Sequence, residues 1–439
     1  MTLSVGENLY YIRRKYKLRQ HQIVEGTVSR NLISMIEHGK TPLLESVAKT
    51  IATNINKLIR DKHPSVYIDS DDLLNPSRYQ AKNVADIYAA KIRNAIAEKW
   101  ELSDSTVLEM EEFLNLWNLT DKKVAIYELL GDLYYSLNDV EKEYLYYNKA
   151  FDNALAYKGI KEKYKIVGKL IHNCIVSEKN REVIRLASLI TSIEKDISPP
   201  YLKSIYYNSA IAYKRVREFN NSILSLEKAK HYTSLEETKL LYGIYLLEGN
   251  CYKERGEFAK AIECYKEALT FDLDVESKCH IYTNIIDIYI KEDKPHEYYK
   301  YIENVLKLES TEEFITHTGV KVYYMMGSFF RKLSDVVKAE EYFLKAMELI
   351  KKKNNRSLHF KQTLIDLFEL YNQTGDNKKQ IGLINSVKEI IDSGHVEINS
   401  DTVLLMKYVL LLLERQDGAT AKELILKTID KGGVLDVLS

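Results

Sequence analysis

The residues of this chain that could do chemistry are hydrogen-bonding and basic side chains near its start. Arg30 and Asn31 are adjacent, and these residue types can bond the edges of guanine and adenine in the DNA major groove. Neighbouring polar residues are spaced to contact bases or phosphates. The predicted DNA-contacting set is Gln20, Ser29, Arg30, Asn31, Ser34, Lys40 and Thr41.

Residues 19–39 predict the element that holds these side chains: a short helix, a tight turn and a second helix. Gly26 suits the turn, Thr27 or Ser29 can cap the second helix, and Gly39 can end it. This is the helix-turn-helix layout, which places its second helix in the major groove. The apolar positions that would pack the two helices together are Ile23, Val28, Leu32, Ile33 and Ile36.

The charge distribution agrees with a nucleic-acid partner. Residues 1–62 contain eleven Lys or Arg and five Asp or Glu, a net charge of +6. The whole chain has 63 of each sign, so the remainder carries −6. A basic segment on a neutral chain is typical of a DNA-binding domain.

A second set of polar residues falls on a repeat that fills the rest of the chain. A large residue is followed four positions later by a small residue, and three positions after that by an aromatic one. This pattern predicts tetratricopeptide-like helix pairs, which form a right-handed solenoid whose concave groove is lined by the first helix of each pair. The small positions are 131, 172, 210, 249, 286, 327 and 368, with 172 degenerate and spacings of 37 to 41 residues.

The predicted groove carries side chains that suit an extended peptide. Asparagine amides can bond both the donor and the acceptor of a peptide backbone, and Lys or Arg can hold a carboxylate. Lys169, Asn173 and Asn208 have the spacing of the first three members of a carboxylate clamp, whereas Gly243 and Leu247 occupy the remaining places. The predicted peptide-binding residues are Lys169, Asn173, Tyr207, Asn208, Lys214, Asn250, Lys253, Asp287, Tyr324 and Arg331.

The N-terminal motif resembles a known class. It reads Gln20-x-x-Ile23-x-Glu25-Gly26, then Ser29-Arg30-Asn31-x-Ile33-Ser34-x-Ile36-Glu37-x-Gly39-Lys40. This is similar to the Xre/Cro-type helix-turn-helix, and its compact turn resembles that of the RRNPP family of peptide-responsive regulators. The resemblance implies that Gln20 contacts phosphate, that Arg30 and Asn31 read bases, and that a short signalling peptide switches the protein, as in quorum sensing.

The predicted organisation is all-α, with three parts. Residues 1–62 form the DNA-binding domain, 63–100 a linker and connecting helix, and 101–439 the repeat domain for peptide sensing and oligomerisation. Paired DNA half-sites require a homodimer, with helices 79–100 and 402–414 as candidate contacts. The alternative is a repeat-based scaffold that binds a signalling protein, as the resemblance implies for Rap-like members, with DNA binding secondary.

Other function classes are disfavoured. The ten histidines form no His-x-x-x-His pair, and no glycine-rich phosphate loop is present, so we expect no enzyme activity and no cofactor. Cys174, Cys251, Cys264 and Cys279 lack metal-ligand spacing and predict reduced core residues rather than a metal site. No apolar run reaches the roughly 18 residues of a membrane span, and no signal peptide is evident, so a cytoplasmic location is expected.

Overall fold

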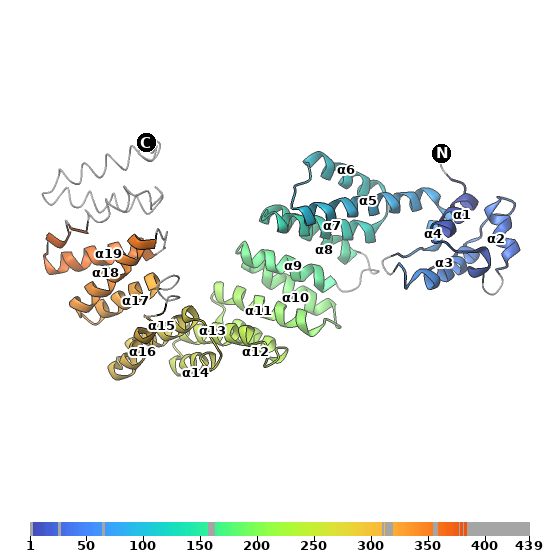
Figure 1. Cartoon of the computed structure of the whole chain (residues 1–439). Helices are drawn as coiled ribbons and strands as arrows, with labels where there is room; N and C mark the ends of the chain where they lie inside the picture. The colour runs from blue at the N-terminus through green and yellow to red at the C-terminus, as the bar shows by residue number, and fades with distance from the viewer. Residues whose placement is uncertain are drawn as a thin grey trace, which may run out of the picture. The chain divides into compact units, whose positions relative to one another are not determined.

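The computed structural model of the chain is built from helices, as predicted (Figure 1). Its contacts divide it into two compact units, Met1–Thr233 and Ser234–Ser439. The residues that it describes are 3–24, 28–63, 66–156, 163–309, 311, 319–353, 359–376, 378–380 and 382–383. In these ranges no β-strand occurs, and the predicted all-α class of repeated helix pairs is confirmed.

The first helices of unit 1 form a small cluster that we call the head. Ser4 and Glu7 begin its first helix with reciprocal side-chain to backbone hydrogen bonds. The head helices are α1 (Val5–Lys15), the 3₁₀ turn η1 (Gln20–Gln22), α2 (Arg30–Glu37), α3 (Glu45–Ile59) and α4 (Ser70–Leu74). Their shared buried core includes Leu9, Ile12, Ile23, Ile33, Ile36, Ile51 and Ile55.

The predicted helix, turn and helix are present in part. The predicted short helix is a single 3₁₀ turn, and residues 25–27, which include Gly26 and Thr27, lie outside the described residues. Of the two predicted caps, Ser29 begins α2, and its hydroxyl accepts a hydrogen bond from the Leu32 amide at 3.2 Å. Gly39 follows the helix with a φ of 70°, which suits glycine.

Residues beyond the predicted boundary at 62 pack on the head. Ile68, Leu73 and Tyr79 belong to the same buried cluster as α1 to α3. Asn56 on α3 holds the backbone of Ile68 with two hydrogen bonds, at 2.7 and 2.9 Å. The boundary itself stays a prediction, but the stretch interpreted as a linker is attached to the head by apolar contacts and hydrogen bonds.

The rest of unit 1 is a series of antiparallel helix pairs. Its first two helices are in contact through Tyr88 and Phe113, whose rings meet edge to face at 5.4 Å. The helices are α5 (Pro76–Glu98), α6 (Asp104–Leu116), α7 (Thr120–Ser136), α8 (Val140–Ala156), α9 (Lys163–Val176), α10 (Asn180–Ile193), α11 (Pro199–Arg215) and α12 (Phe219–His231).

Unit 2 continues the same pattern. Six of the seven predicted small positions lie in the first helix of a described pair, and position 368 lies in α19. The candidate dimer helix 402–414 is outside the described residues. The helices are α13 (Thr238–Glu254), α14 (Phe258–Ala268), α15 (Val275–Lys291), α16 (Pro295–Leu308), α17 (Gly319–Lys332), α18 (Val336–Lys353) and α19 (His359–Thr374).

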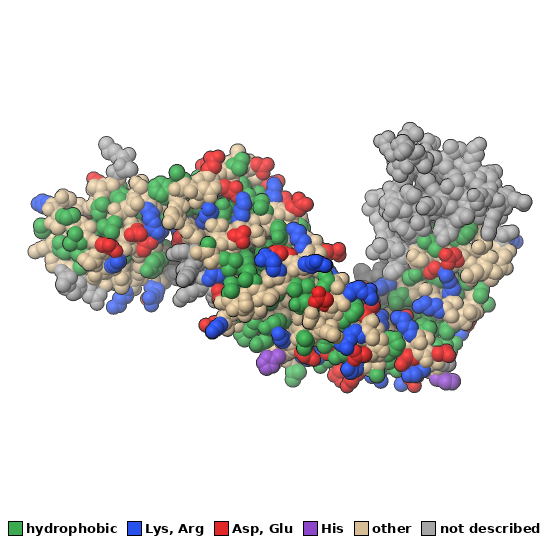
Figure 2. Space-filling model, turned by 180° about the vertical axis from the view of Figure 1, so that it is seen from behind, with side chains coloured by type: hydrophobic (Ala, Val, Ile, Leu, Met, Phe, Trp, Pro, Cys, Tyr) green, Lys and Arg blue, Asp and Glu red, His purple; other side chains and the backbone are tan. Residues whose placement is uncertain are grey.

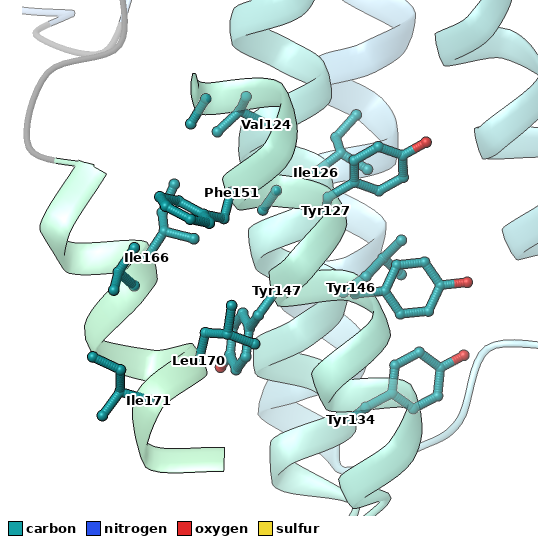
Figure 3. Close-up of a cluster of buried hydrophobic side chains, with 14 of the residues drawn as sticks. Val124, Ile126, Tyr127, Tyr134, Tyr146, Tyr147, Phe151, Ile166, Leu170 and Ile171 are labelled. Carbon is teal, nitrogen blue, oxygen red and sulfur yellow. The ribbon is translucent and has the colours of Figure 1, made fainter. Parts of the chain in front are cut away.

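Glycine at the small position lets an aromatic ring of the second helix reach the first. A Cβ built on Gly249 would lie 2.6 Å from the Tyr265 ring, and Gly131 and Gly327 meet Tyr147 and Phe343 in the same way. Figure 3 shows this packing in unit 1, where Tyr147 and Phe151 point toward α9, whereas Tyr127, Tyr134 and Tyr146 lie on the opposite side. In these three pairs the ring-to-backbone contact therefore fixes the spacing of the two helices.

Gly131→Ala is expected to lower the free energy of unfolding by about 1–3 kcal/mol, because the added methyl overlaps the Tyr147 ring. That ring cannot easily move, since its hydroxyl donates to Asp132 at 2.7 Å. Gly168→Ala is the matched control, because its new methyl would meet Tyr201 at an ordinary 3.5 Å. We expect that variant to gain up to about 1 kcal/mol from helix propensity. The free energies of unfolding are measured in urea, and equal changes in the two variants would contradict this account.

Candidate functional site

The outer face of α2 carries the predicted base-reading side chains. Ile33 and Ile36 point into the head core, so the opposite face is left to Arg30, Asn31 and Met35. Arg30 and Asn31 are exposed, and Met35 is 44% exposed. The head thus presents an arginine and an asparagine together on the first turn of an exposed helix face.

A basic cavity of about 700 Å³ adjoins this face. It lies between the end of α1, η1 and the start of α2, and the described residues that line it include no carboxylate. Such a concentration of positive charge suits an anion such as a phosphate group. The lining residues are Arg13, Arg14, Lys17, Leu18, Arg19, Gln20, His21 and Arg30.

Glu37 at the end of α2 links that helix to α1 and η1 through hydrogen bonds. Arg13 donates to both of its carboxylate oxygens, at 2.6 and 2.9 Å, and Gln20 donates to it at 2.7 Å. The Arg13 and Glu37 side chains are 7% and 3% exposed. Gln20 was predicted to contact phosphate, but one of its amide hydrogens is used in this hydrogen bond within the protein.

The remaining predicted DNA-contacting residues surround the same face. Ser29 is exposed but its hydroxyl caps α2, Ser34 is half-buried, and Lys40 and Thr41 follow the helix. Across the face of the molecule drawn in Figure 2, by comparison, basic and acidic side chains are interspersed. The cavity at the head differs from that mixture because the charged residues described in its lining are all basic.

A buried charge network joins the head to α5. Asp72, whose side chain is fully buried, accepts from Lys82 and from Arg78, both at 2.5 Å. Asp69 bonds the same two cations, at 2.8 Å from Arg78 and 3.2 Å from Lys82. Asn8 on α1 donates to the backbone carbonyl of Asp72 at 2.7 Å. Helix α5 continues from this network into the core of the first helix pairs.

In unit 1 the predicted groove contains a cavity of about 590 Å³. Its wall includes Lys169 and His172 of α9, together with Asp132 and Tyr135 of α7. Lys169 bonds Glu128 at 2.8 Å and Asp132 at 2.7 Å. Burial alone would lower the pKa of Lys169, but these hydrogen bonds outweigh it and raise the pKa. The first member of the clamp-like spacing is therefore already paired.

Asn173 lies behind the groove rather than on its surface. It is 1% exposed, and its Nδ2 donates to the Val140 carbonyl at 2.9 Å. Burial raises the pKa of the neighbouring Glu143, while a hydrogen bond from Asn173 opposes the shift. The other predicted residues of this unit, Tyr207, Asn208 and Lys214, lie half-buried on α11.

In unit 2 a cavity of about 300 Å³ gathers three of the predicted residues, Lys253, Asp287 and Tyr324. The other two predicted residues of this unit, Asn250 and Arg331, are not in its wall. Asn250 accepts from the Tyr265 hydroxyl at 2.8 Å, and Arg331 donates to two carboxylates. Sequence reasoning missed Lys332, which also lines the cavity and stands five residues after the small position 327. The complete lining is Lys253, Thr283, Asn284, Ile286, Asp287, Ile290, Tyr324, Met325, Met326, Ser328, Phe329 and Lys332.

The described ranges contain neither a candidate metal site nor a helix that could span a membrane. In those ranges no three or more His, Cys, Asp or Glu side chains group so as to hold a metal ion. The helices described there also include none with the length and apolar content to cross a membrane. The four cysteines are buried as free thiols, and burial raises the pKa of Cys174 to about 12.

The sequence matches the tetratricopeptide repeat family at two places, residues 243–274 and 320–353. The first match covers most of α13 and α14, and the second covers α17 and α18. No curated protein matches the chain.

Several solved structures are similar to this chain at low identity. The apo form of RapI is 15% identical, with 72% of this chain and 86% of that chain covered and a TM-score of 0.49. Bacillus thuringiensis PlcR, solved with the peptide PapR7 and DNA, is 18% identical, with 66% and 98% covered and a TM-score of 0.32. MamA is 18% identical, with 45% and 97% covered and a TM-score of 0.36. The two sequence matches identify tetratricopeptide repeats in unit 2 of this chain.

Proposed function

We propose that this protein is a cytoplasmic transcriptional regulator that binds double-stranded DNA through its head and a short signalling peptide through its repeats. The observation that carries the proposal is the exposed Arg30–Asn31 pair beside a cavity lined by basic side chains. Arginine and asparagine supply base-edge hydrogen bonds, and the basic cavity supplies phosphate contacts. The resemblance of the N-terminal motif to peptide-responsive regulators supports the same conclusion.

The peptide part of the proposal rests on the repeat grooves. Both units contain a cavity on the first helices of successive pairs, with polar and aromatic side chains in its wall. Such walls suit an extended backbone. We include a homodimer in the proposal because two head domains on paired half-sites bind DNA more tightly than one.

A second candidate is a protein-interaction scaffold. The two tetratricopeptide matches favour it, because helix-pair repeats expose long concave surfaces that suit protein partners. In that case the head would add little, and a variant of its exposed α2 face would leave function unchanged. DNA selection therefore separates the two candidates.

Arg30→Ala with Asn31→Ala should abolish sequence selection from a pool of randomised 20-base-pair duplexes. Each lost base contact is worth about 1–3 kcal/mol of discrimination. The wild-type chain should enrich a defined motif over successive rounds, and the double variant should retain only salt-sensitive, unselective binding. Enrichment is read by sequencing, and affinity by gel shift.

Arg93→Ala is the matched control, because Arg93 is an exposed helical arginine on α5 outside the head. That variant should enrich the same motif with the same affinity. If the Arg30 and Asn31 double variant enriches the wild-type motif, the assignment of these residues is wrong. If the wild-type chain enriches no motif, the scaffold candidate is favoured.

A further inference from the structure

The cavity of unit 2 has an apolar wall and a polar wall. It is formed by the first helices of three consecutive pairs, α13, α15 and α17. Its volume of about 300 Å³ is at the lower end of the range for small-ligand pockets, so it has room for a single residue rather than a whole peptide. The apolar part of the wall is supplied by Ile286, Ile290, Met325, Met326 and Phe329.

The polar wall holds more positive than negative charge. Asp287 is approached by three ammonium groups: Lys291 at 3.0 Å, Lys253 at 3.6 Å and Lys332 at 3.7 Å. Only the first distance is within hydrogen-bond range. The three lysines lower the pKa of Asp287 against the opposing effect of burial. Among the described residues, one carboxylate thus faces three ammonium groups at this point.

Lys253 has the least exposed side chain of the three lysines around Asp287. Its side chain is 15% exposed, and it donates to Asn284 Oδ1 at 2.7 Å. Burial lowers its pKa, and Asp287 and Glu254 only partly offset this effect. Because an ammonium group has three N–H donors, an incoming carboxylate could accept a further hydrogen bond and supply the missing charge.

We propose that this cavity binds the C-terminal residue of a short peptide, with the free carboxylate on Lys253 and Lys332 and an apolar side chain against Met326 and Phe329. The proposal rests on the proposed peptide-binding function and names the group that is recognised. A terminal residue carries a carboxylate and an apolar side chain together. An internal Asp or Glu would supply the carboxylate but no apolar side chain at the same residue.

The probe is a set of three pools of N-acetylated pentapeptides with random sequence, incubated with the full chain. The first pool ends in Leu, Met or Phe with a free carboxylate, and the second is the same pool with a C-terminal amide. The third has an amide end and one internal Asp or Glu. Bound peptides are identified by mass spectrometry, and selected ones are measured by calorimetry. We expect the first pool to bind at least about tenfold tighter than its amide counterpart, as for other charge-assisted hydrogen bonds.

Lys253→Met should weaken the selected free-acid peptides at least about tenfold and leave their amides unchanged. Lys332 is 59% exposed, so Lys332→Met tests the same charge without disturbing the packing. Lys260→Met is the control, because Lys260 is an exposed lysine of α14 that pairs with Glu257 and does not line the cavity. It should bind all peptides like the wild type.

Equal binding of free-acid and amide pools would overturn the inference, as would preference for the third pool or an absence of binding by all three. The inference would also be overturned if Lys253→Met and Lys332→Met each lost as much affinity for the amide peptides as for the free-acid peptides. Duplex selection by the same preparation is measured separately. A chain that selects DNA and binds amides as well as acids would keep the proposed function and lose only this inference.

Discussion

Glu37→Ala is expected to destabilise the head by about 3–5 kcal/mol, because it leaves the buried guanidinium of Arg13 without its carboxylate. The variant also removes the acceptor of Gln20, which joins η1 to α2. Since α2 carries Arg30 and Asn31, the variant should also select DNA less well. Hydrogen exchange measured by mass spectrometry can report the head separately from the helix pairs, which a global unfolding curve of a multi-unit chain cannot.

Two variants make this test specific. Glu45→Ala removes an exposed partner of Lys49, whose ion pair has side chains 67% and 64% exposed, and should leave the hydrogen exchange of the head close to that of the wild type. Arg13→Met combined with Glu37→Met removes both buried charges and should recover much of the loss. Hydrogen exchange gives a free energy of opening for α1 and α2. If this value in Glu37→Ala stays within about 1 kcal/mol of the wild type, the Arg13–Glu37 pair does not stabilise the head.

The repeat fold could be predicted because its packing depends on residue size at fixed spacing. Gly131, Gly249 and Gly327 each receive an aromatic ring of the second helix, and this requirement leaves a visible pattern in the sequence. The end of α2 was equally predictable, since Gly39 adopts a positive φ there. Such local rules need no knowledge of the partner elements.

The groove residues were harder to predict because polar positions on the first helix serve two purposes. The residue after the small position was interpreted as part of the wall. In two repeats it instead accepts a hydrogen bond from the tyrosine that packs on the glycine: Tyr147 to Asp132 at 2.7 Å, and Tyr265 to Asn250 at 2.8 Å. Where Phe343 replaces the tyrosine, no hydroxyl needs an acceptor. Part of the asparagine pattern therefore has a packing explanation, and the peptide role of Asn250 stays a prediction.

The segment 63–78 shows a further limit of sequence reasoning. Its prolines and acidic cluster are typical of a solvated linker. Two carboxylates of the cluster, Asp69 and Asp72, instead form ion pairs with Arg78 and Lys82 of α5. Whether an acidic run is solvated or buried depends on partners that only the folded chain brings together, so composition alone could not distinguish the two.

Asp72→Ala is expected to loosen the head from α5, at a cost of about 3–5 kcal/mol, because Lys82 is 9% exposed and loses its closest carboxylate. Asp71→Ala is the matched control, since Asp71 is the exposed neighbour on the same short helix. Under trypsin, cleavage at Arg78 and Lys82 should become many-fold faster in the first variant and unchanged in the second. Equal cleavage rates in the two variants would show that the network does not hold this junction.

The same variant tests how a signal could reach the head. Within unit 1, α5 is shared between the head, through Tyr79 and Lys82, and the first helix pairs, through Ala85, Ala89 and Ile92. A change in the repeats can bias DNA binding only through elements that both parts share. Asp72→Ala should therefore retain selection of the wild-type DNA motif by its intact α2 face, while losing any effect that a selected peptide has on the affinity for that motif. If the peptide effect persists undiminished in a variant whose junction trypsin cleaves rapidly, α5 is not the route of coupling.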